Sequence, residues 1–156
     1  MDPRKFALYG GIVMLAMGAV SLIPNFVGSQ SSLPLLNLDT SYGLFMGYFP
    51  MNIMNKMALI IFGVAGILVS GLKFNALPRS ILYSRVVFVV MGLAALLGLI
   101  NETSTGFGYW PLFGGEAFAH GVFAILGAYY GFALTAKVQN EIRTKPSLQK
   151  TFQSGR

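Results

Sequence analysis

Long apolar stretches alternate with polar connections along the whole chain. There are four such stretches, at residues 6–23, 53–72, 81–100 and 117–138. Each is close to the ~20 helical residues that cross a hydrocarbon core of ~30 Å. The pattern predicts an all-α fold, an integral membrane four-helix bundle of two helical hairpins. Together the spans form a single domain, because no room is left for a separate soluble one.

The connection between the first two stretches is long and contains an apolar piece of its own. Within it, residues 42–49 read YGLFMGYF. Eight residues are too few to span a bilayer as a helix, so we expect an interfacial or re-entrant segment lying on the bundle. After the last stretch the sequence turns polar, and residues 139–156 are expected to form a basic cytoplasmic tail that follows the transmembrane domain of residues 1–138.

Composition and charge agree with a membrane location. Of 156 residues, 54% are hydrophobic and 10% are charged, whereas soluble domains carry about 25% charged residues. Ten of the eleven basic residues lie at the same end of the expected hairpins: before the first stretch, between the second and the start of the third (Arg85), or from the end of the fourth (Lys137) onward. The positive-inside rule therefore predicts both termini in the cytoplasm. This distribution explains the net charge of +6 without nucleic acid, so the expected partners are lipid and either another membrane protein or further copies of the chain.

The first stretch also resembles a secretory signal peptide, because Arg4 and Lys5 precede it. Its apolar run is longer than the core of such a peptide. Removing it would leave three spans and break the charge bias. We therefore expect it to be retained as the first span.

Few side chains are available for catalysis or metal binding. The chain has no cysteine and one histidine, His120, so thiolate sites, His-rich metal sites and His-based triads cannot form within one chain. The five acidic residues lie far apart in sequence, and no Gly-rich run ends in the Lys-Ser/Thr pair of a phosphate-binding loop. We expect neither enzymatic activity nor a metal site.

Glu116 and His120 form the most suggestive pair of ionisable residues. They are four residues apart, so a helix places them on one face. Ionisable groups inside a membrane span are costly and often functional. The pair is either a hydrogen bond that ties the helix to a loop, or a proton-handling pair. His120 is also a candidate axial ligand of a haem or chlorophyll-type pigment.

Lys56 is the one basic residue outside the cytoplasmic set. It lies one turn into its span, where we expect a carboxylate to pair with it. Lys56 would form a polar cluster near the outer interface with four other residues: Glu116, His120, Glu102 and Asp39. Any of the three acidic residues could be the carboxylate that pairs with it. The alternative is a lysine whose ammonium simply reaches the interface.

Small residues recur four positions apart within the apolar stretches. Such spacing lets helices approach closely in lipid. An outward-facing set of this kind would serve dimerisation or docking. We expect helix packing at five glycines of the pattern: Gly11, Gly66, Gly98, Gly127 and Gly131.

Residues 42–68 carry motifs that resemble a known family. The run YGLFMGYFPMNIMNKMALIIFGVAGIL contains Phe-Pro-x-Asn at residues 49–52 and Gly-Val-x-Gly at residues 63–66. The start, FALYGGIVMLAMGAVSLIPN, and the late run EAFAHGVFAILGAYYGF look like the first and last helices of the same family. The chain thus resembles an uncharacterised bacterial family of small four-helix membrane proteins, classed as a domain of unknown function.

The resemblance covers most of residues 6–134 and implies no reaction. It implies a bacterial inner membrane or a thylakoid-type membrane, since the family is common in cyanobacteria, actinobacteria and some proteobacteria. Relatives often carry histidines in the second helix. This chain has other residues there, so no histidine site is implied in that helix: Met54, Asn55, Lys56, Met57 and Ala58.

These observations favour a non-catalytic role. The leading hypothesis is an accessory, scaffold or assembly subunit of a larger membrane complex, because the spans lack the buried charges that ion pathways need. The alternative is a small transporter or channel working as an oligomer. It is supported by Lys56, by the expected re-entrant segment at residues 42–49, and by a faint repeat between residues 48–50 and 109–111. The second alternative is a haem or pigment-binding membrane protein that uses His120.

Overall fold

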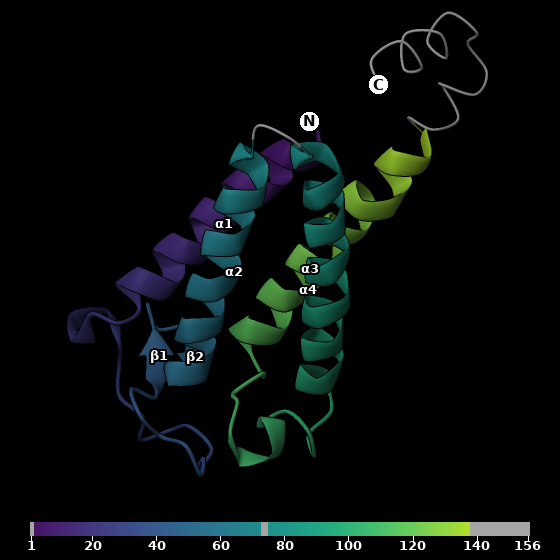
Figure 1. The fold of residues 1–156 in the computed structure, drawn as a ribbon. Helices are drawn as coiled ribbons and strands as arrows, with labels where there is room; N and C mark the ends of the chain where they lie inside the picture. The colour runs from purple at the N-terminus through teal and green to yellow at the C-terminus, as the bar shows by residue number, and fades with distance from the viewer. Residues whose placement is uncertain (1, 73–74, 138–156) are drawn as a thin grey trace, which may run out of the picture.

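The chain folds into two helical hairpins joined by structured loops. The computed structural model describes residues 2–72 and 75–137, so the predicted tail at residues 139–156 lies outside the described residues. The helices are α1 (Pro3–Val20), α2 (Ile53–Gly71), α3 (Ala76–Leu99) and α4 (Gly115–Ala128). α1 packs antiparallel to α2, and α3 packs antiparallel to α4 (Figure 1).

Both ends of the described chain lie at one end of the bundle, and the long connections lie at the other (Figure 1). Within residues 2–72 and 75–137, three helices are long and apolar enough to cross a membrane: α2, α3 and the helix Gly115–Lys137 that begins with α4. The protein is therefore a membrane protein of mainly helical structure.

The boundaries of α1 differ from the predicted first span. The helix begins and ends three residues earlier than residues 6–23. The Asp2 carboxylate caps it and accepts hydrogen bonds from the backbone N–H groups of Arg4 and Lys5, at 2.8 and 3.1 Å. Because those two basic residues occupy its first turn, α1 is less apolar than the other three helices.

Two other helices also depart from the predicted spans. α3 begins at Ala76 and includes Pro78 in its first turn, where the backbone N–H groups have no partner within the helix and proline is tolerated. α4 continues into a π-helical turn, η3 (Tyr129–Ala133). At this turn the Gly131 carbonyl accepts a hydrogen bond from Nε of Arg85, at 2.9 Å.

The segment predicted to be interfacial or re-entrant contains a β-hairpin, which corrects the all-α expectation. β1 (Gly43–Phe45) pairs antiparallel with β2 (Phe49–Met51), with Leu44 opposite Pro50. Met46, Gly47 and Tyr48 connect the strands, and the first two have φ of +50° and +77°. Positive φ at a tight connection suits the twist of a hairpin, and aromatic residues on either side favour strands.

We use the name loop cap for residues 21–52 and 100–114, which lie at the end of the bundle opposite the termini (Figure 1). The loop cap contains the β-hairpin and two 3₁₀ turns, η1 (Pro24–Phe26) and η2 (Gly106–Gly108). It covers the ends of both helical hairpins. Its contacts with α2 and α4 therefore decide how the side chains at those helix ends are placed.

Glycines bring the helices together. A Cβ atom at Gly11 would lie 2.8 Å from the Gly63 carbonyl oxygen, and one at Gly127 would lie 2.7 Å from the Ser84 carbonyl oxygen. Side chains larger than hydrogen would force both helix pairs apart. The other glycines of the predicted packing set also face a neighbouring segment at clash distance: Gly66, Gly98 and Gly131.

Candidate functional site

Asn52, at the start of α2, joins the two halves of the loop cap. Its side-chain oxygen caps α2 by accepting a hydrogen bond from the backbone N–H of Met54 at 3.0 Å. Its amide nitrogen donates to the carbonyl oxygens of Leu38 and Tyr109, at 3.0 and 2.8 Å. Leu38 and Tyr109 belong to different connections, so one buried side chain holds both connections to the helix.

Asn55 links α2 to the first turn of α4. Its amide nitrogen donates to the Pro111 carbonyl oxygen at 3.1 Å and to Oε2 of Glu116 at 3.3 Å. The same Oε2 lies 3.5 Å from Nε2 of His120. Glu116 is 3% exposed and His120 is 9% exposed. The structure thus brings the predicted pair into contact, but inside the bundle and not at a wet surface.

Two polar atoms beside this network lack a hydrogen-bond partner among the described residues: Nδ1 of His120 and Nε1 of Trp110. Both atoms are buried, and leaving such a group unpaired costs about 1–3 kcal/mol. Trp110 was part of the faint repeat at residues 109–111 but not one of the predicted site residues. The available signal was that it is the one tryptophan of the chain, in a Gly- and aromatic-rich connection.

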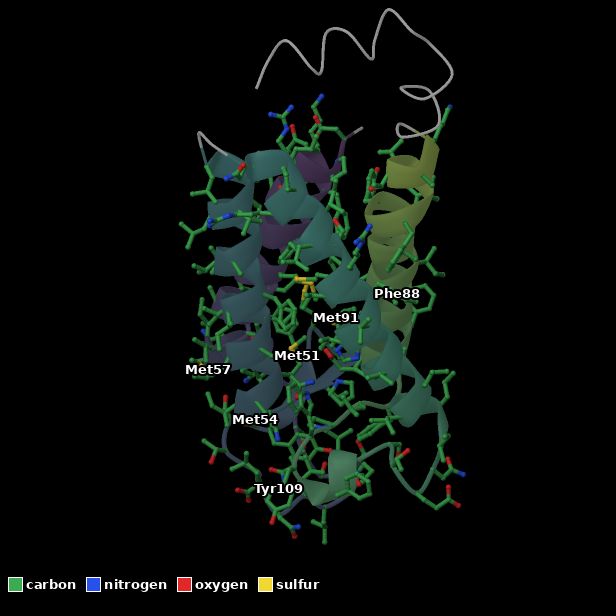
Figure 2. The ribbon with its side chains drawn as sticks, turned by 45° about the vertical axis from the view of Figure 1, so that its right-hand side comes forward. Met51, Met54, Met57, Phe88, Met91 and Tyr109 are labelled. Carbon is green, nitrogen blue, oxygen red and sulfur yellow. The ribbon has the colours of Figure 1, made fainter. Side chains whose placement is uncertain are left out.

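A cavity of about 260 Å³ lies next to these groups, bounded by α2, α3 and the start of α4. Its polar lining consists of Asn55, Glu116 and His120 at the helix ends, and of Trp110 from the loop cap. Met91, also in the lining, lies near mid-height of the bundle, and Tyr109 marks the level of the loop cap (Figure 2). The cavity therefore extends from the loop cap toward the middle of the membrane-spanning helices.

Lys56 does not form the predicted ion pair. Its ammonium donates to the carbonyl oxygen and to Oγ of Ser41, at 2.8 and 2.7 Å. Across residues 2–72 and 75–137 no carboxylate pairs with it, and Asp39 and Glu102 are exposed. The prediction is wrong because Ser41, at a turn with φ of +56°, brings two neutral acceptors onto the ammonium.

The contact between Lys56 and Ser41 predicts which of two substitutions destabilises the protein more. Ser41→Ala leaves a buried charge with one acceptor fewer and is expected to cost about 1–3 kcal/mol. Lys56→Met removes the charge together with its need for acceptors and is expected to cost less. Thermal unfolding in detergent measures both, and Ser41→Ala should cost little in the Lys56→Met background. A larger loss from Lys56→Met than from Ser41→Ala would contradict this account.

The surroundings of His120 bear on cofactor binding. Nε2 faces Glu116, and Nδ1 has no hydrogen-bond partner among residues 2–72 and 75–137. In the part of the chain that the structure describes, no group of three or more His, Cys, Asp or Glu residues is placed to hold a metal ion. A haem or chlorophyll-type pigment at His120 stays a prediction.

Comparison with known proteins confirms the resemblance found in the motifs. Residues 4–133 match a family described as a domain of unknown function, DUF4383. The match covers the four helices and the loop cap. No curated protein and no solved structure matches the chain. The chain belongs to the DUF4383 family.

Proposed function

We propose that this protein is a non-catalytic accessory or scaffold subunit that docks onto a larger membrane complex through its loop cap. The observation that carries the proposal is a set of large apolar side chains exposed on the cap. Leu35, Tyr48 and Phe107 are 91%, 76% and 73% exposed. The remaining members of the set are Leu22, Ile23, Phe26, Met46, Ile100 and Tyr109.

The backbone beneath two of these side chains adopts a strained conformation. Met46 and Phe107 have φ of +50° and +57°, a conformation that is uncommon and costly for large residues. Asn52 ties the cap beneath them to α2. Strained positions that expose apolar side chains suit a preformed contact surface, where little order is lost on binding.

The proposal includes α1 as a fourth span, next to α2, in a bacterial inner or thylakoid-type membrane. With both termini cytoplasmic, as the basic residues favour, the loop cap lies on the opposite side of the membrane. Aromatic side chains are favoured at the headgroup level. The exposed side chains of the cap could therefore contact either lipid headgroups or a partner protein, and an experiment must distinguish the two.

Site-specific photocrosslinking in native membranes makes that distinction. A photoreactive residue at Tyr48 or Phe107 is expected to give a discrete adduct with another protein. The same residue at Leu96, exposed on α3, is the control and is expected to give none. Adducts with lipid alone, or only with further copies of the chain, would contradict an accessory role.

Substitution of the cap tests the same point by a second route. Tyr48→Ser combined with Phe107→Ser is expected to abolish co-purification of the crosslinked partner, because apolar anchors carry much of the energy of an interface. The thermal stability should hardly change, since both side chains are exposed. Retention of the partner at wild-type yield would show that it docks elsewhere.

The alternative of a transporter or channel has less support. The cavities between helices in the described residues are lined mainly by apolar side chains. An ion path through protein needs polar groups along its length. Lys56, one of the features that suggested transport, is engaged by Ser41 at the loop cap.

A further inference from the structure

Glu116 is a buried carboxylate with one oxygen that is still free to accept a hydrogen bond. It is 3% exposed, and its Oε2 accepts from the Asn55 amide and faces Nε2 of His120. Oε1 accepts no hydrogen bond within residues 2–72 and 75–137. Among these residues, the unpaired side-chain atoms that are sealed from solvent belong to Ser80, Trp110 and His120. Oε1 is therefore not sealed, and Glu116 lines the cavity between α2, α3 and α4, which gives a ligand access to it.

His120 supplies no positive charge to balance this carboxylate. A protonated imidazole carries an N–H on both ring nitrogens. Nδ1 of His120 is buried, and no acceptor reaches it from the part of the chain that the structure describes. A buried, charged donor without an acceptor is strongly disfavoured. The imidazole is therefore neutral, with Nε2 as the nitrogen that donates toward Glu116.

No other basic side chain of the described residues balances Glu116. The cavity lining contains neither lysine nor arginine. Lys56 lies next to Asn55 on α2, but its ammonium donates to the carbonyl oxygen and to Oγ of Ser41. A buried carboxylate without a counter-charge is costly. A ligand that brings a positive charge and N–H donors removes this cost, whereas an anionic ligand would increase it.

The rest of the cavity suits the apolar body of such a ligand. Its volume of about 260 Å³ exceeds the roughly 150 Å³ cavity that takes up benzene. Phe62 and Trp110 line it, and aromatic rings attract cations as well as apolar groups. Val90 and Leu93 also line it and are 41% and 57% exposed on a helix long enough to span the membrane. The cavity wall thus reaches the surface of α3, where an amphiphile dissolved in lipid meets it.

We propose that the cavity binds a lipophilic amine with one positive charge. The ammonium group donates to Oε1 of Glu116, and the apolar body fills the space between α2 and α3. The charge of the carboxylate and the apolar lining together select the ligand, because neither a neutral amphiphile nor an anionic one satisfies both. This binding does not depend on the docking of a partner to the loop cap.

Isothermal titration calorimetry of the full chain in a non-ionic detergent tests the charge of the ligand. The probe is 4-phenylbutylamine, which is a cation at neutral pH. The compounds 4-phenylbutan-1-ol and 4-phenylbutanoate have nearly the same size and are neutral and anionic. We expect one-site binding of the amine and about tenfold weaker binding of the other two compounds. No binding of the amine, or equal or tighter binding of the alcohol or the carboxylate, would overturn the proposal.

Glu116→Gln tests the carboxylate itself. Glutamine keeps the size of the side chain and removes its charge, so the amine is expected to bind about tenfold more weakly, while binding of the alcohol stays the same. Glu102→Gln is the matched control, because it removes the same charge from an exposed residue that does not line the cavity. If the two variants bind the amine equally well, Glu116 does not hold the ammonium and the proposal fails.

A filled cavity locates the binding without changing any charge. Ala94→Phe places a ring in the cavity and is expected to abolish the stabilisation of the protein by the amine in thermal unfolding. Ala95→Phe is the control, because Ala95 is the next residue of α3 and does not line the cavity. Size-exclusion profiles like that of the wild type show that both variants fold. Equal stabilisation of Ala94→Phe and Ala95→Phe by the amine would place it elsewhere and overturn the proposal.

Discussion

Gly63→Val is expected to separate α1 from α2 and to lower the free energy of unfolding by about 3 kcal/mol or more. A Cβ atom at Gly63 would lie 2.5 Å from the backbone nitrogen of Leu15 and 2.7 Å from the carbonyl oxygen of Gly11. Both are backbone atoms of the facing helix, so no side-chain rotation relieves the clash. The helices must move apart along the hairpin.

The effect is large because helices in lipid associate through close packing. With α1 as the proposed fourth span, the lipid tails around it are as apolar as the helix surfaces, and the hydrophobic effect adds little between α1 and α2. Gly11 and Gly18 of α1 both face backbone atoms of α2, and Gly63 faces α1 in return. A methyl group or larger at this seam removes contacts over several turns, not at one residue.

Gly121→Ala is the control for Gly63→Val. Gly121 lies inside α4, and apart from the backbone of its own helix turn no described atom lies within 4 Å of a Cβ atom added there. The alanine should raise stability by about 0.5–1 kcal/mol, because glycine disfavours a helix interior. Thermal unfolding followed by circular dichroism in detergent measures both variants. If Gly63→Val unfolded at the same temperature as Gly121→Ala, the contact between α1 and α2 would tolerate a side chain.

Asn52→Ala is expected to release the loop cap from the helices at a cost of about 2–3 kcal/mol. The substitution removes the cap of α2 and the two bonds to the Leu38 and Tyr109 carbonyl oxygens. These carbonyls belong to the two separate connections of the cap. Protease sites within residues 24–52 and 100–114 should therefore become accessible together, at temperatures where the helices remain folded.

Asn52→Ser separates the two roles of Asn52. Serine retains an oxygen that caps the helix but has no amide to reach the loops. Asn52→Ser should therefore recover about 1 kcal/mol relative to Asn52→Ala and still show early cleavage of the loop cap. Wild-type resistance to protease in Asn52→Ser would mean that the bonds to Leu38 and Tyr109 do not hold the cap.

Local chemistry explains which features the sequence predicted. A helix in lipid satisfies its own backbone hydrogen bonds, so length and polarity alone located α2 to within a residue at either end. The contact of Glu116 with His120 followed from spacing within one helix turn. The predicted starts of α1 and α3 were wrong because hydropathy averages over many residues. The start of α1 depends on the cap at Asp2, and the start of α3 depends on Pro78 being accepted in its first turn.

What the sequence by itself determined was a mainly helical membrane protein of the DUF4383 family with an ionisable pair in its last helix. The partner of Lys56, the β-hairpin and the cavity beside Trp110 depended on tertiary structure. Ser41 meets Lys56 across 15 positions, and Asn55 meets Pro111 across 56. Such contacts depend on how the loops fold back over the helix ends. The hydrophobic periodicity of the chain predicts helices but not the path of these loops.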